Sequence, residues 1–176
     1  MTTLLGISGS LRAASTNTKL VHHAADLFGA DQFTIGDLRL PLYDGDLEAR
    51  DGIPASVQRL ANQIATADAV IIATPEYNKS ISGVLKNALD WVSRTQGNVW
   101  LDKPVAIMSA AAGRAGGERA QFALRLCMVQ FRPDLLQGPE ILIAQNGDAF
   151  DDNGKLVSPR NIDNLTALMT RLKSRL

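Results

Sequence analysis

The stretch Ala69-Val70-Ile71-Ile72-Ala73 is continuously apolar and stops at Thr74-Pro75. A strand with one face in water shows apolar residues only at every second position, whereas this run is apolar throughout. Such a run is typical of a central parallel strand that is covered on both faces. Parallel neighbours are joined by long crossovers, usually helices, so this stretch indicates an α/β chain.

Short apolar runs alternate with amphipathic segments along the rest of the chain. This alternation predicts a three-layer α/β sandwich, with a five-stranded parallel sheet and helices on both faces. We treat residues 1–176 as a single domain and expect the segment 39–53, rich in Pro, Gly and Asp, to be an irregular insertion. The predicted strands are 3–7, 32–35, 69–73, 104–109 and 140–144, and the predicted helices are about 16–28, 81–92, 117–128 and 159–175.

Composition restricts the functional class. The chain has 18 basic and 18 acidic residues, so nothing indicates a nucleic-acid partner or an anionic membrane surface. Cys127 is the only cysteine, which excludes an internal disulfide and fits a reducing compartment. The first ten residues lack the basic region of a signal peptide, and no apolar stretch approaches the ~20 residues that span a bilayer. We expect a cytoplasmic protein without membrane insertion.

The first predicted strand is followed by a loop rich in hydrogen-bond donors, and then by a helix. Small residues let main-chain N–H groups converge on an anion, and the helix N-terminus adds its partial positive charge. These features predict a site for a phosphate monoester; the alternative is a plain turn in which a side chain only caps the helix. The loop contains neither G-x-G-x-x-G nor a Walker sequence. Its candidate donors are Ser10, Arg12, Ser15, Thr16 and Asn17.

Two further loops follow the third and fourth predicted strands. The first offers main-chain groups, an amide and an aromatic face to a flat heteroaromatic ring; the alternative is a solvated turn with its tyrosine over the core. The second, 109–117, is rich in Ala and Gly and brings N–H groups close to a ligand; the alternative is a flexible loop. Ligands of open α/β sheets bind at these strand ends. The candidate residues are Pro75, Glu76, Tyr77, Asn78 and Lys79 in one loop and Ser109 and Gly113 in the other.

Three ordered motifs carry a family resemblance that spans nearly the whole chain. The motif G-S-L-R-x-x-S-x-N runs from Gly9 to Asn17, P-E-Y-N from Pro75 to Asn78, and G-R-A-G-G-E-R-A-Q-F-A-L-R from Gly113 to Arg125. Together they resemble the NADPH-dependent FMN reductases. Within that family, the resemblance is greatest to the soluble quinone and chromate reductases. The resemblance implies a flavodoxin-like fold, FMN as cofactor, NADPH or NADH as electron donor, and a homodimer or homotetramer.

The resemblance also implies roles for individual residues. Ser10, Arg12, Ser15 and Asn17 hold the FMN phosphate, and residues 76–79 line the isoalloxazine ring, mostly through the main chain. The family's third loop commonly carries adjacent hydroxyl residues, but here Ser109 is followed by Ala110, Ala111 and Ala112. We therefore expect only main-chain contacts beyond Ser109.

The predicted function is transfer of hydride from NAD(P)H through FMN to a small-molecule acceptor, with quinones first and chromate, azo dyes, ferric chelates or free flavin as further candidates. One open face of a flavin cannot easily hold both substrates, so a ping-pong scheme is predicted. The cofactor carries the chemistry, and no catalytic side chain is assigned. The alternative is a flavodoxin-type electron carrier, although the balanced charge and Arg12 are not typical of that class.

Other residues are assigned less specific roles. His22 and His23 are consecutive on a predicted helix and point ~100° apart, so they do not chelate one metal, and no metal site is predicted. Cys127 lies on an apolar stripe, which favours packing over redox chemistry. Trp91 is expected in the core and Trp100 near the site rim. Arg114 has two open interpretations: it steers an anionic substrate, or it is a solvated loop residue.

Overall fold

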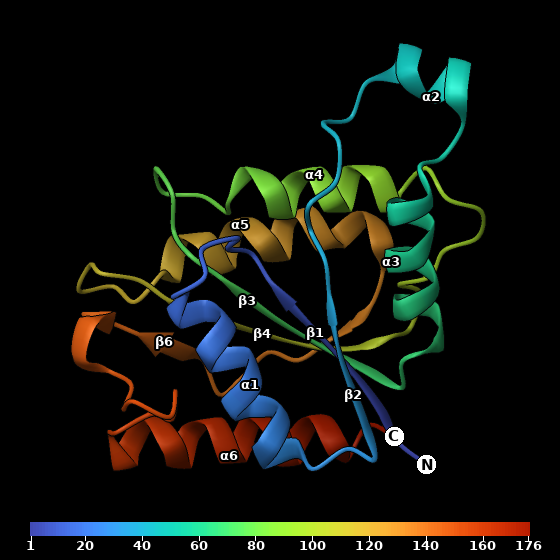
Figure 1. Cartoon of the computed structure of the whole chain (residues 1–176). Coiled ribbons are helices and arrows are strands. Elements are labelled where there is room, and N and C mark those ends of the chain that lie inside the picture. The colour runs from blue at the N-terminus through green and yellow to red at the C-terminus, as the bar shows by residue number, and fades with distance from the viewer.

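The computed structural model describes all residues, 1–176, and its centre is a parallel sheet (Figure 1). The strand order is β2-β1-β3-β4, with β5 and β6 both pairing with the outer edge of β4. Every strand pair is parallel, so all carboxyl ends lie at one edge of the sheet. The strands are β1 (Thr3–Ser8), β2 (Gln32–Gly36), β3 (Ala69–Thr74), β4 (Pro104–Ala110), β5 (Asp134–Leu135) and β6 (Ile141–Ile143).

The fifth position of the sheet is occupied by two short strands. β5 pairs with the beginning of β4 and β6 pairs with its end. Gly138 and Pro139 lie between them, and a proline has no N–H to donate to a ladder. The order 2-1-3-4-5 of a flavodoxin-like sheet results, and the predicted α/β class with five strand positions is confirmed.

Helices cover both faces of the sheet (Figure 1). Serine caps three of these helices: the Ser15, Ser82 and Ser158 hydroxyls accept hydrogen bonds from main-chain N–H groups in the first turns. Helices α1 (Thr16–Phe28) and α6 (Pro159–Lys173) lie on one face; α3 (Ala55–Thr66), α4 (Gly83–Val92) and α5 (Glu118–Met128) lie on the other. No helix is both long and apolar enough to cross a membrane.

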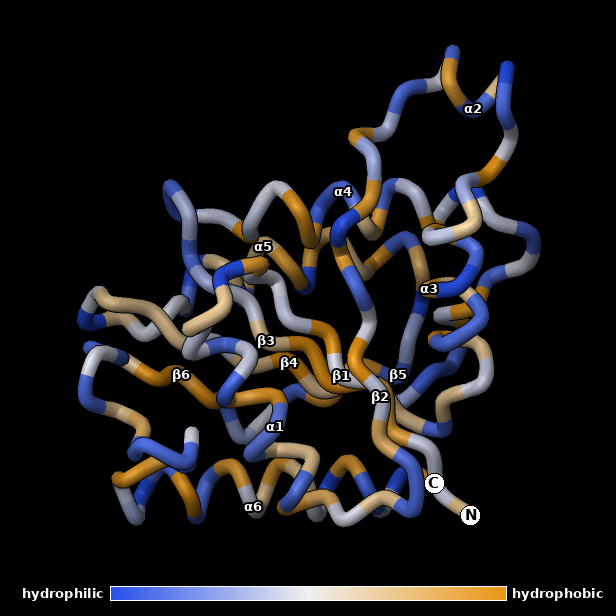
Figure 2. The backbone as a smooth tube through the Cα atoms, viewed as in Figure 1, coloured by the Kyte–Doolittle hydropathy of each residue, from blue (hydrophilic) through white to orange (hydrophobic).

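The hydrophobic core is divided by the sheet into two halves of 20 buried residues each. Alternate residues of β3 point to opposite faces of the sheet. Ile71 packs toward α1 and α6, whereas Val70 and Ile72 pack toward α3, α4 and α5. All six residues of β3 are buried, as the continuous apolar run predicts. The apolar colouring accordingly concentrates on the strands in Figure 2.

The structure differs from the sequence predictions between β2 and β3. The predicted helices do not include α3, although its buried residues Val57, Leu60, Ala61 and Ile64 follow a helical repeat. The segment expected to be irregular contains helix α2 (Gly45–Asp51), in which no residue is buried. The chain also contains two 3-10 turns, η1 (Val129–Phe131) and η2 (Asn146–Asp148).

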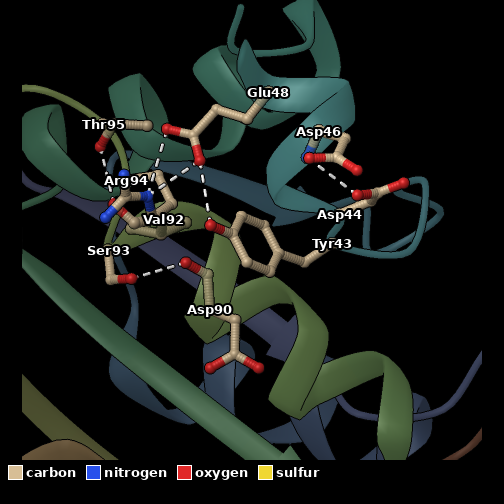
Figure 3. Close-up of polar contacts among 9 residues, drawn as sticks. All are labelled: Tyr43, Asp44, Asp46, Glu48, Asp90, Val92, Ser93, Arg94 and Thr95. Carbon is tan, nitrogen blue, oxygen red and sulfur yellow. Dashed lines mark hydrogen bonds and ion pairs between the residues drawn. The ribbon is translucent and has the colours of Figure 1, made fainter.

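Residues 37–54, here called the arm, connect β2 to α3 and project from the body of the molecule (Figure 1). Its base is fixed by Pro41, whose carbonyl accepts hydrogen bonds from Trp91 Nε1 at 2.8 Å and from Asn87 Nδ2 at 2.9 Å. Farther out, the Glu48 carboxylate accepts from the Tyr43 hydroxyl and from Arg94 Nε, both at 3.0 Å (Figure 3). The arm is therefore held to α4 and the turn after it by polar contacts.

Candidate functional site

The loop after β1 presents several unpaired donors. The main-chain N–H groups of residues 11, 13, 14, 16 and 17 donate no hydrogen bond within the chain. Ser15 caps α1, because its Oγ accepts from Thr18 N at 3.2 Å. Capping leaves the other N–H groups available, and they surround a helix N-terminus with its partial positive charge. The loop therefore provides what an anion such as a phosphate requires.

Arg12 adds a full positive charge to this loop. Its side chain is exposed, and its guanidinium makes no hydrogen bond or ion pair within the chain. Ser10 Oγ accepts a long hydrogen bond from Arg12 N at 3.4 Å, which leaves the hydroxyl proton free to donate. The loop also lines a cavity of about 270 Å³ together with residues 35–39.

Asn17 and Thr16 tie this loop to other parts of the site. Asn17 is buried; its Nδ2 donates to Ala110 O at 2.9 Å, and its Oδ1 accepts from Ala110 N at 3.0 Å. Thr16 Oγ1 accepts from Asn146 Nδ2 at 2.6 Å. The Asn17 side chain thus joins α1 to the end of β4, and its main-chain N–H is the group left free. The sequence prediction did not foresee this link.

The loop after β3 forms a tight turn. Tyr77 and Ser80 exchange two main-chain hydrogen bonds of 3.0 Å, and the two residues between them, Asn78 and Lys79, have φ angles of 50° and 66°. Two successive positive φ values are typical of a type I′ turn, which asparagine tolerates better than lysine. Pro75 is buried, whereas Tyr77 is 50% exposed. Tyr77 therefore does not lie over the core, and its ring is accessible at the site edge.

Glu76 points away from this turn and toward α5. Its Oε2 accepts from Arg119 N at 3.2 Å, and its Oε1 lies 3.6 Å from Arg119 Nη1. The Glu76 side chain is 16% exposed. The second loop is thus connected to the helix that follows the third loop.

The third loop depends on glycine at two positions. Gly116 and Gly117 have φ angles of 62° and 92°, and a Cβ at Gly116 would lie 2.7 Å from the carbonyl carbon of Leu142. Ser109 is buried; its Oγ donates to Gly116 O at 2.6 Å and accepts from Gln121 Nε2 at 2.9 Å. The Ser109 hydroxyl therefore supports the loop from below, while Gly113 is exposed and has open space around it.

A fourth segment, which the sequence prediction missed, contacts the same edge. After β6, Gln145 N donates to Gly113 O and Asn146 N donates to Ala111 O, both at 3.3 Å. Asn146 also donates to Thr16, so it contacts both the first and the third loop. The sequence contains one indication of this segment: the dipeptide Asn146-Gly147 is a common turn signal, and it comes just after a strand.

The loops after β1, β3 and β4 lie together on the left of Figure 1, at the carboxyl edge of the sheet. Unpaired N–H groups and Arg12 gather in one loop, and a tight turn and a glycine loop form the other two. This set suits an elongated ligand with a phosphate at one end and a flat polar ring at the other, as in FMN. No group of three His, Cys, Asp or Glu side chains is placed to hold a metal ion.

The residues assigned to packing lie away from this edge. His23 Nδ1 accepts from Leu156 N at 3.0 Å, and Cys127 packs at the margin of the core half between the sheet and α5. Trp91 is fully buried, as expected. Trp100 is 1% exposed, so its predicted place at the site rim is wrong; it packs beside Phe131 instead.

The sheet and its helices define a flavodoxin-like fold, with a candidate ligand site in the loops at the carboxyl ends of its strands. Residues 2–146 match the model of the NADPH-dependent FMN reductase family, and the chain belongs to that family. It is accordingly an enzyme, an NAD(P)H-dependent oxidoreductase with FMN as cofactor. The predicted family, enzyme class and cofactors are confirmed, and the carrier alternative is not favoured.

Individual relatives agree with this assignment. The chain is 43% identical over 159 residues to an NAD(P)H-dependent FMN reductase of Pseudomonas aeruginosa, covering 89% of this chain and 85% of that protein. It is 37% identical over 169 residues to a quinone reductase of Escherichia coli K12, covering 92% and 88%. Among solved structures, a flavoenzyme NAD(P)H:(acceptor) oxidoreductase of Paracoccus denitrificans superposes with a TM-score of 0.87 at 32% identity, covering 99% and 96%.

Proposed function

We propose that the chain is an NAD(P)H:quinone reductase whose net reaction converts a quinone, NAD(P)H and a proton into a hydroquinone and NAD(P)⁺. The observation that carries the proposal is the set of unpaired N–H groups beside Arg12, at the same sheet edge as two loops that are suited to a flat ring. The quinone reductase of Escherichia coli, which is 37% identical, supports the choice of acceptor.

The first loop would hold the FMN phosphate. Its five free N–H groups, the Ser10 hydroxyl and the Arg12 guanidinium provide charge-assisted hydrogen bonds, and Ser15 and Thr16 keep the helix N-terminus in place. Asn17 contributes its main-chain N–H, while its side chain fixes the loop to β4.

The second and third loops would border the ring. The turn at Asn78 and Lys79 and the chain from Pro75 to Tyr77 offer main-chain groups on one side, and Gly113 allows close approach on the other. The Ser109 hydroxyl, which donates to Gly116 O, would support this loop. When bound, FMN supplies the redox chemistry by taking a hydride equivalent from NAD(P)H and passing two electrons to the acceptor.

These loops all lie at a single edge of the sheet. Both substrates would therefore use the same exposed side of the site in turn. The half-exposed Tyr77 would border that side, and Arg114, also exposed, would face the anionic nicotinamide cofactor. No side chain is proposed to transfer a proton. The scheme predicts parallel lines in double-reciprocal plots when both substrates are varied; intersecting lines, together with a ternary complex measured by direct binding, would contradict the shared side.

The proposal is tested on purified protein. It should contain FMN and be reduced anaerobically by NADPH or NADH without any partner protein, and a quinone should then reoxidise it. Reduction only through a separate reductase would indicate a carrier instead. Parallel assays with chromate, an azo dye, a ferric chelate and free flavin would rank the acceptors, and each nicotinamide cofactor is compared at equal concentration.

We further propose a cytoplasmic homodimer or homotetramer. The lone Cys127 and the absence of a charge bias support a cytoplasmic location, and the resemblance to a family of oligomers supports self-association. Sedimentation of the FMN-loaded protein would distinguish the two assemblies from a monomer.

A further inference from the structure

Helix α5, which follows the third loop, has no capping side chain of its own. Its N-cap residue is Gly117, and no side chain in the third loop bonds to the first turn. The first N–H groups of a helix need partners from outside the helix. Here Arg119 N finds its partner in Glu76 Oε2 at 3.2 Å.

Glu76 is remote in sequence, 43 residues earlier, and belongs to the second loop. Its side chain is only 16% exposed, whereas that of Arg119 is 55% exposed. The Glu76 carboxylate is therefore paired with the helix N-terminus and with the nearby Arg119 guanidinium, at 3.6 Å. This contact joins the two loops that would border the flavin ring.

We propose that Glu76 is a positioning residue: its carboxylate caps α5 and thereby fixes the spacing between the second and third loops, on which binding of the flavin ring depends. This inference rests on the proposed function, because it places the ring between these loops. The resemblance assigns Glu76 to the ring site through its main chain; the geometry assigns a separate role to its side chain.

The proposal separates ring binding from phosphate binding. Losing the cap should weaken the binding of FMN and of riboflavin by the same factor, because both contain the ring. Losing Arg12 should weaken the binding of FMN alone. The ratio of the two affinities therefore distinguishes a defect in ring binding from a defect in phosphate binding.

The test compares Glu76→Ala, Glu76→Gln and Arg119→Ala, with Glu118→Ala as matched control because Glu118 is an exposed acid of the same helical turn without a partner. Dissociation constants for FMN and riboflavin are measured by flavin fluorescence. Loss of a capping contact predicts a rise of roughly three- to thirtyfold in both constants for Glu76→Ala. Glu76→Gln, which retains an oxygen that accepts from Arg119 N, should recover most of the affinity.

Amide exchange of residues 113–119 is measured on flavin-free protein, so it tests the coupling without reference to the reaction. Exchange should be faster in Glu76→Ala than in Glu118→Ala. Unchanged exchange and unchanged constants, or equal effects in the control, would overturn the proposal. If Glu76→Ala does not fold, Glu76→Gln and Arg119→Ala decide between the N–H cap and the ion pair. A wild type that binds flavin but oxidises no NAD(P)H would reject the proposed function while leaving the exchange result standing.

Discussion

The site edge and the arm are both held by polar contacts, but in different surroundings. At the site edge, Asn17 and Ser109 are buried, and their hydrogen bonds join separate loops. In the arm, Tyr43, Glu48 and Arg94 form a comparable set of bonds at the surface (Figure 3). A buried group that loses its partner has no water to replace it, whereas an exposed group does. Similar bond lengths should therefore have very different effects on stability.

The largest effect is expected for Asn17→Ala. The substitution removes two hydrogen bonds of 2.9 and 3.0 Å and leaves the Ala110 main chain without these partners inside the protein. Each unsatisfied buried group costs ~1–3 kcal/mol, so loss of both partners should lower the free energy of unfolding by roughly 2–6 kcal/mol. Urea denaturation of the flavin-free protein measures this change, and Asn146→Ala, which removes one partly buried bond, is the control. A loss equal to that of the control would show that burial is not the deciding factor.

Arg12→Ala should leave stability nearly unchanged but weaken FMN binding. The side chain is exposed and makes no contact within the chain, so its charge is free for a ligand. A charge-assisted hydrogen bond contributes ~1.5–3 kcal/mol, which predicts roughly ten- to a hundredfold weaker FMN binding. Riboflavin affinity serves as the control and should not change. Equal weakening of both flavins would reject the phosphate assignment.

These two residues also show what the sequence could predict. Arg12 and Asn17 occur in one motif, and the sequence gives them the same expected role. The structure leaves Arg12 free but joins the Asn17 amide to Ala110, 93 residues later. Local patterns report hydrogen-bonding capacity and backbone preference, so they predicted the loops; they carry no information about which distant main-chain groups a side chain will meet.

The same limit appears in the fold. The continuous apolar run predicted β3 because a strand that is buried on both faces has an apolar residue at nearly every position. The apolar repeat of helix α3 is recognisable in the sequence, whereas the interruption of the fifth strand depends on how it pairs with β4. Glu76 was placed in the correct loop, but its contact with Arg119 is set by tertiary packing.

Substitution of His23 should change stability by less than Asn17→Ala and by more than the arm variants, and its effect should depend on pH. Its pKa is lowered below the ordinary value, first by burial and then by the Lys155 charge, with Asp151 acting in the opposite direction. The neutral ring also accepts from Leu156 N, which protonation of Nδ1 would prevent. A lowered folded pKa means that the unfolded chain binds the proton more readily, so this contribution is present above pH ~6.5 and declines as the pH falls toward the folded pKa. Unfolding midpoints at pH 7.5 and 5.5 should therefore differ less in His23→Asn than in the wild type.

The smallest effect is expected in the arm, where Glu48→Gln and Arg94→Ala should barely change the unfolding midpoint. The pKa of Glu48 is lowered, chiefly by the hydrogen bond from Arg94, and the pKa of Tyr43 is raised, chiefly by its hydrogen bond to Glu48. The Glu48 contribution is present above its unfolded pKa of ~4.3 and declines as the pH falls through its folded pKa; the Tyr43 contribution is present below ~10 and is lost as the pH rises through its folded pKa. Between these two pH limits the network should hold the arm while adding little to global stability, because exposed partners are readily replaced by water.

Amide exchange of residues 43–51 should increase in Glu48→Gln at pH 7, and Asp46→Asn, whose carboxylate is not part of this network, is the matched control. A large fall in the unfolding midpoint of Glu48→Gln would mean that the arm folds cooperatively with the sheet, and the contrast with the buried site edge would fail.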